Sequence, residues 1–158
     1  MTSPISLAIS LLALIAAHSV SAGEKLRLLE QEPSVGSEKH LYEIKNNEVL
    51  VNDQLITLFA ISKDGISASY RNKTEERTKP RYTIEVYNAY GLLVGKDRLG
   101  DSISFFGGST YMDPGEVSAE KIHLEEYPLA EILTHSNIEI PEDLMEMKWI
   151  VLSETNTR

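Results

Sequence analysis

Short apolar runs separated by turn residues fill the chain beyond residue 23, and little of it shows helical periodicity. This pattern predicts an all-β domain, because strands are short and are bounded by Gly, Asn, Asp and Pro. One short helix is expected at residues 128–135, where apolar residues recur at near-helical spacing. The expected strands cover residues 41–44, 49–51, 55–61, 66–70, 82–90, 92–94, 102–106, 117–124 and 147–152.

Two turn signals predict how neighbouring strands pair. Asn46-Asn47 lies between the first two expected strands, and Asp64-Gly65 lies between the third and the fourth. Two-residue turns of this kind join antiparallel strands, so both flanking pairs are expected to be hairpins. Roughly seven to nine strands at this spacing predict two packed antiparallel sheets, an immunoglobulin-like sandwich. A small β-barrel is the alternative.

Two segments predict how their strands are buried. Tyr82, Ile84 and Val86 alternate with more polar residues, which indicates a strand with one face towards the core and one towards water. Residues 147–152 are almost continuously apolar and contain Trp149. Such a run is typical of a strand covered on both sides, so Trp149 is expected in the core.

The N-terminal segment has the features of a signal peptide. Residues 5–17 are apolar, and Val20 and Ala22 stand at the small-residue cleavage positions. The apolar run is about 13 residues long, shorter than the roughly 20 that a membrane-spanning helix needs. We therefore expect a signal peptide at residues 1–22 and a single β-sandwich domain at residues 23–158, in a periplasmic or secreted protein without a stable membrane span after cleavage. An uncleaved anchor is the alternative.

Charge and cysteine content narrow the classes of partner. The chain carries 24 Asp and Glu against 15 Lys and Arg, a net charge of −9, so nucleic acid and anionic membrane surfaces are poor partners. It has no cysteine, which excludes disulfides, thiolate zinc sites and thiol nucleophiles. These features favour an acidic protein of a bacterial-type envelope that folds by packing alone.

Three segments carry a resemblance to a known family. In the strand at residues 84–88, Ile84, Val86, Tyr87 and Asn88 stand where the pattern has Phe, Leu, Tyr and Asp, and Gly91 follows. A polar turn at residues 72–74 precedes it, and an Asp-Pro-Gly-Glu turn follows at residues 113–116. Over about residues 65–124 the sequence thus resembles the FxLYD family of small bacterial extracytoplasmic domains. The family has no common enzymatic activity, so the resemblance implies a module of envelope or secreted proteins.

No catalytic motif or cofactor site is found, and the chain is expected not to be an enzyme. His40, His123 and His135 remain after signal cleavage and lack metal-ligand spacing. Asp97 and Asp101 fall short of a calcium loop. Acidic residues adjoin at 75–76, at 125–126 and at 142–146, and hydrolases do use two carboxyls with separated pKa values. A small secreted hydrolase with a carboxylate pair therefore stays open, as does a soluble carrier or inhibitor.

One local cluster of positive charge stands out on this acidic chain. Residues 71–81, called the basic loop below, are predicted to connect two strands. The loop also contains the glycosylation sequon Asn72-Lys73-Thr74, which is expected to be accessible in a polar loop. We expect a non-catalytic binding or assembly module whose partner is another envelope or secreted protein, and the basic loop is the candidate docking site. Its cationic residues are Arg71, Lys73, Arg77, Lys79 and Arg81.

Overall fold

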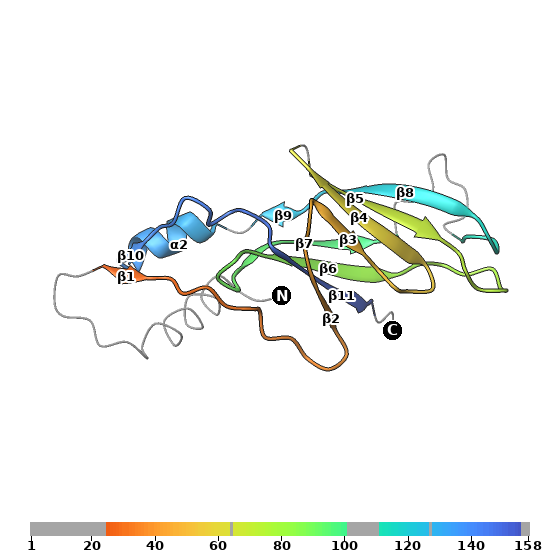
Figure 1. The fold of residues 1–158 in the computed structure, drawn as a ribbon, viewed down its shortest axis with the longest axis horizontal. Coiled ribbons are helices and arrows are strands. Elements are labelled where there is room, and N and C mark those ends of the chain that lie inside the picture. Colours follow the sequence, from red (N-terminus) through yellow and green to blue (C-terminus); the bar gives the residue numbers. More distant parts are fainter. Residues whose placement is uncertain (1–24, 64, 101–110, 127, 156–158) are drawn as a thin grey trace.

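The computed structural model describes residues 25–63, 65–100, 111–126 and 128–155. The expected signal peptide at residues 1–22 and the expected strand at residues 102–106 lie outside the described residues. Within them, two antiparallel sheets lie in separate layers, and the predicted sandwich is confirmed (Figure 1). The sheets do not close on each other, so the alternative of a small barrel is wrong.

The first layer is a four-stranded antiparallel sheet in the order β3-β4-β5-β8. Its strands are β3 (Glu48–Leu50), β4 (Ile56–Ser62), β5 (Gly65–Arg71) and β8 (Val117–Ile122). The predicted hairpin at Asp64-Gly65 is confirmed, because β4 and β5 pair down to Ser62 opposite Gly65.

The second layer is a five-stranded antiparallel sheet in the order β2-β11-β6-β7-β9. Its strands are β2 (His40–Glu43), β6 (Tyr82–Tyr87), β7 (Leu93–Leu99), β9 (Glu125–Glu126) and β11 (Trp149–Glu154). The chain changes layer between β5 and β6 and again between β7 and β8, as in immunoglobulin-like sandwiches.

A small appended unit lies at one end of the sandwich (Figure 1). The predicted short helix is present as α2 (Leu129–His135), and it buries Leu129 and Leu133. Two strands that the sequence did not predict, β1 (Leu26–Arg27) and β10 (Ile138–Glu139), form a parallel pair beside it. Each has only two residues, too few for a periodic signal.

The core between the sheets is filled from the inward faces of both. Tyr82, Ile84 and Val86 of β6 are buried, which confirms the predicted alternation. Phe59 of β4 and Tyr70 of β5 meet them from the other sheet, each with no exposed surface. The outer face of β6 is not fully wet, because Glu85 is buried there and binds the Lys39 ammonium at 2.7 Å.

The predicted hairpin between the strands at 41–44 and 49–51 is wrong. Asn46 and Asn47 do make a tight turn with φ values of 52° and 60°, and Lys45 and Glu48 exchange two backbone hydrogen bonds of 3.1 and 3.0 Å. Beyond this bridge the strands part, because β2 pairs with β11 in one sheet and β3 pairs with β4 in the other. The turn therefore joins the two layers.

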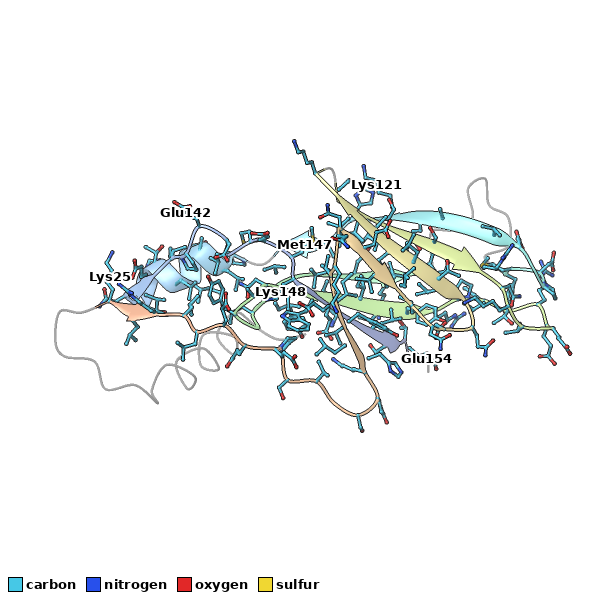
Figure 2. All side chains as sticks on the ribbon, in the orientation of Figure 1. Lys25, Lys121, Glu142, Met147, Lys148 and Glu154 are labelled. Atoms are coloured by element: carbon cyan, nitrogen blue, oxygen red, sulfur yellow. The ribbon has the colours of Figure 1, made fainter. Side chains whose placement is uncertain are left out.

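Strand β11 is buried on both sides, as predicted. The prediction that Trp149 lies in the core is wrong. Ile150 and Leu152 point into the core, and Val151 on the opposite face has no exposed surface. Trp149 is half-buried at the start of the strand, with the Lys148 ammonium 5.8 Å from its ring centre. The aromatic side chain thus lies at the start of β11, next to Lys148, which is labelled in Figure 2.

Candidate functional site

Asn72, at the start of the basic loop, organises its backbone from the inside. Its side chain is buried, with 1% exposed. The Nδ2 group donates to the carbonyls of Glu76 at 2.9 Å and Met112 at 2.8 Å. Its Oδ1 accepts from the backbone N–H of Thr74 at 3.0 Å and from the Thr74 hydroxyl at 2.6 Å. One side chain thus satisfies four polar groups and fixes the loop.

The basic loop also pairs with the turn at residues 113–116. The Asn72 N–H donates to the Glu116 carbonyl at 3.0 Å, and the Gly115 N–H donates to the Asn72 carbonyl at 2.8 Å. Farther along, Thr78 and Met112 exchange two backbone hydrogen bonds of 2.9 and 2.8 Å. The polar turn and the Asp-Pro-Gly-Glu turn, the two flanking segments of the family resemblance, therefore pack directly against each other.

The expected accessibility of the glycosylation sequon is wrong. Both amide hydrogens of Asn72 are taken up by the carbonyls described above, and the side chain is buried. Attachment of a sugar to Nδ2 would require the loop to open. The polar composition of the loop did not reveal this, because one polar residue faces inward.

The structure brings the cations of the basic loop to one end of the sandwich. Arg71, Lys73 and Arg77 are exposed, whereas Lys79 and Arg81 are half-buried. Lys73 donates to the Asp53 carbonyl at 3.1 Å and keeps its charge unpaired within the described residues.

Arg77 of the basic loop contacts an acidic and an aromatic side chain. Its Nε lies 3.4 Å from a carboxylate oxygen of Asp113, and its guanidinium lies 5.5 Å from the ring centre of Tyr111. Tyr111 is itself 50% exposed. Exposed Arg and Tyr side chains are the residue types that carry most binding energy at protein interfaces. Tyr111 is 30 or more residues from the basic loop in the sequence, so no local pattern connects the two.

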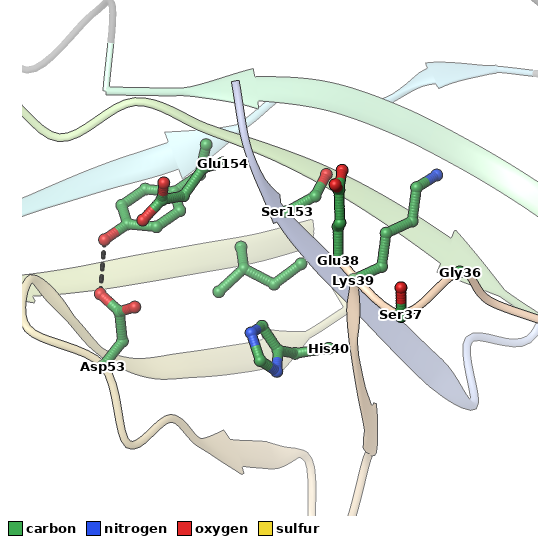
Figure 3. A pocket seen from close by; sticks show the side chains of 10 residues that line it. Gly36, Ser37, Glu38, Lys39, His40, Asp53, Ser153 and Glu154 are labelled. Atoms are coloured by element: carbon green, nitrogen blue, oxygen red, sulfur yellow. Dashed lines mark hydrogen bonds between the residues drawn. The ribbon is translucent and has the colours of Figure 1, made fainter. Parts of the chain in front are cut away.

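A polar pocket of about 710 Å³ opens at the edge of the sandwich where β2 begins and β11 ends (Figure 3). Glu38, Asp53, Glu154 and His40 line it. The Tyr82 hydroxyl, also in the wall, donates a hydrogen bond to Asp53. Burial, followed by this hydrogen bond, raises the pKa of Tyr82 far above its usual value, so the phenol stays neutral and serves as a donor.

Two carboxylates from different sheets, Asp97 of β7 and Glu120 of β8, influence each other electrostatically. Asp97 pairs with Ile84, and Glu120 pairs with Ala68, so both lie on inward-facing positions. Glu120 is buried, and one of its oxygens accepts from the Tyr70 hydroxyl at 3.0 Å and from the Gly100 N–H at 2.9 Å. These bonds give Glu120 a structural role in joining the sheets.

The environment of Asp97 disfavours its charge. Burial is the main cause that raises its pKa, and the Glu120 carboxylate adds to this increase. Hydrogen bonds from the Arg98 and His123 backbone N–H groups, at 2.7 and 3.2 Å, oppose it. In the sequence, Asp97 was of interest only as a calcium ligand. Glu120 lies two residues before Ile122 and so shares its inward face, and this charged residue at an inward position was an unused indication of an acidic pair at inward positions.

The three histidines do not form part of a metal-binding cluster among the described residues. His40, His123 and His135 are all exposed. Among the residues that the structure describes, no three His, Asp or Glu side chains are arranged to hold a metal ion. Within the same described residues, no helix is long and apolar enough to cross a bilayer.

Comparison of the chain with protein-family models, with curated proteins and with solved structures gives no significant match.

Proposed function

We propose that this chain is a non-catalytic binding or assembly module, exported to the periplasm or cell exterior, that docks a protein partner through the basic loop. The partner presents an acidic segment, because the loop is the one concentration of positive charge on a chain of net charge −9. The resemblance to the FxLYD family implies a module of envelope or secreted proteins, which is in line with this proposal.

The observation that carries the proposal is the anchoring of the loop by Asn72. Four hydrogen bonds from one buried side chain fix the backbone from which the cations project. A loop that is ordered before binding loses little conformational entropy when a partner docks. Arg77 and Tyr111 then provide an exposed cationic and aromatic anchor at its edge.

A hydrolase built on two carboxylates is the weaker candidate. Asp97 and Glu120 are the acids that influence each other, and one of them has a raised pKa. One carboxylate oxygen of Glu120, however, accepts hydrogen bonds from the Tyr70 hydroxyl and the Gly100 N–H inside the sandwich, where it stabilises the fold. A general acid or base needs a free oxygen that reaches substrate.

The docking proposal is tested by crosslinking in cells that export the tagged protein, with mass spectrometry of the proteins captured. A variant with Arg77, Lys79 and Arg81 changed to Glu is compared with wild type. A matched control changes Lys25, Arg27 and Lys45 to Glu, the same change in charge away from the loop.

The proposal expects a captured protein with an acidic segment that disappears in the loop variant and persists in the control. Its capture should also weaken as salt is raised, because exposed charges are screened. Capture that is equal in all three forms, or that is lost equally in both variants, would show that the basic loop is not the docking site.

A further inference from the structure

The outer face of the four-stranded sheet is left uncovered in the described part of the chain, and two rows of its side chains span all four strands. Beyond them, Arg71 of β5 and Val117 of β8 form a further outward pair, and Val117 is 64% exposed. The β-sheet register sets Glu48, Ala60, Ser67 and Lys121 side by side across β3, β4, β5 and β8. The next row, one pleat along, contains Leu50, Leu58, Ser69 and Ala119. Neither row points into the core.

Each row is asymmetric from one edge of the sheet to the other. Glu48 lies at the β3 edge, and Lys121 lies at the β8 edge, labelled in Figure 2. Both are exposed, and neither takes part in an ion pair within the described residues. In the second row the bulky residues occupy the β3 half and the small ones the β8 half. Leu50 is 78% exposed.

We propose that this face binds a second copy of the same chain, about a two-fold axis that runs parallel to the strands. Such an axis places β3 of one copy over β8 of the other. Glu48 then faces Lys121 of the second copy, and Leu50 faces the small side chain of Ala119. By symmetry each contact occurs twice.

The alternative axis in the plane of the sheet, perpendicular to the strands, does not give this match. It keeps β3 over β3 and β8 over β8, so like charges gather at the same edge. It also sets Leu50 towards the bulky half of the partner's face. The strand directions of two packed sheets stay within about 30° of each other. With the parallel axis, each row of one copy therefore stays close to the same row of the second copy.

The size of the face sets the strength of the association. The four strands have three, seven, seven and six residues. With strands about 4.8 Å apart and a rise of about 3.3 Å per residue, they present roughly 360 Å² per copy. This is below the area of standard stable interfaces, so the dimer is weak and forms at high protein concentration. Apart from Arg71, which is the last residue of β5, the basic loop lies beyond the end of this sheet.

Sedimentation equilibrium tests the proposal on the full chain, purified in the form that the host leaves it, from about 10 µM to about 1 mM. Wild type should show a monomer–dimer equilibrium within this range. Glu48→Lys and Lys121→Glu should each weaken it at least about tenfold, because each variant brings two like-charged pairs together. Glu142→Lys and Lys25→Glu make the same charge changes outside the face and should dimerise as wild type does.

Mixing the two face variants is the decisive experiment. Each variant alone should associate at least about tenfold more weakly than wild type. One copy of each restores both opposite-charge pairs, so the mixture should form heterodimers at the concentrations at which wild type dimerises. A monomeric wild type over the whole range would overturn the proposal. Undiminished association of the single variants, or no association of their mixture, would overturn it as well.

Discussion

Asn72→Ala should destabilise the protein strongly, although the residue lies in a polar loop. The change removes four hydrogen bonds of 2.6 to 3.0 Å. The bond to the Met112 carbonyl is buried, and that carbonyl is left without its side-chain partner. The Met112 carbonyl keeps its backbone hydrogen bond from the Thr78 N–H, so the loss comes from the four side-chain bonds alone. At about 1 kcal/mol or somewhat less for each bond, the loss is about 2–4 kcal/mol. This is a large share of a typical stability of about 5–15 kcal/mol.

Urea unfolding measures this loss directly, with the fluorescence of Trp149, the single tryptophan of the chain, as the probe. The midpoint should fall by roughly 1–3 M at an unchanged slope. Asn52→Ala, at an exposed asparagine of the β3–β4 loop, is the matched control and should stay within about 0.5 kcal/mol of wild type. If Asn72→Ala were as stable as Asn52→Ala, the side chain would not hold the basic loop.

Three further predictions follow from individual contacts. Gly100→Ala should lower the free energy of unfolding by about 2–4 kcal/mol and the melting temperature with it, because Gly100 has φ +97° and an added Cβ would lie 2.1 Å from the Pro80 carbonyl oxygen. Gly36→Ala is the control, since a Cβ there meets nothing within 4 Å, and equal melting temperatures of the two variants would contradict this reasoning. The stability contributed at Asp97 should fall as pH rises through its raised pKa, because the folded state holds that proton more tightly than the unfolded state. Glu120→Gln should lower the Asp97 pKa measured by NMR, and an unchanged pKa would refute the electrostatic effect of Glu120 on Asp97. The Asp143 hydrogen bond, at 2.6 Å, is the main cause that raises the pKa of Tyr90 to about 12, so Asp143→Asn should move the phenol titration towards 10.0 in ultraviolet absorbance, and no shift would show that this bond is absent in solution.

Local signals in the sequence were sufficient for the sandwich but not for all of its strand partners. The alternation of Tyr82, Ile84 and Val86 fixed which face of β6 is buried. The tight turn at Asn46-Asn47 was identified as well, yet a turn specifies only a reversal of the chain. Which strands pair beyond it depends on distant partners, here β11 and β4, and no local pattern encodes them.

The candidate site was predicted in composition but not in construction. The five cations of the basic loop are visible as a cluster in the sequence, whereas the anchor that holds the loop is not charged. Its signal was present: Ile66, Ala68 and Tyr70 point inward along β5, and the same period places Asn72 inward. A polar residue at an inward position must find hydrogen-bond partners, so continuing the period past the apolar run reveals such anchors.

The docking role of the basic loop is tested most directly by site-specific photo-crosslinking in cells that export the protein. A photoreactive amino acid replaces Glu75, an exposed residue of the basic loop, in one form and Lys25, labelled in Figure 2, in a second form. The proposed function predicts a discrete adduct from position 75, to a protein with an acidic segment, that position 25 does not give. No adduct from position 75, or the same adducts from both positions, would contradict it.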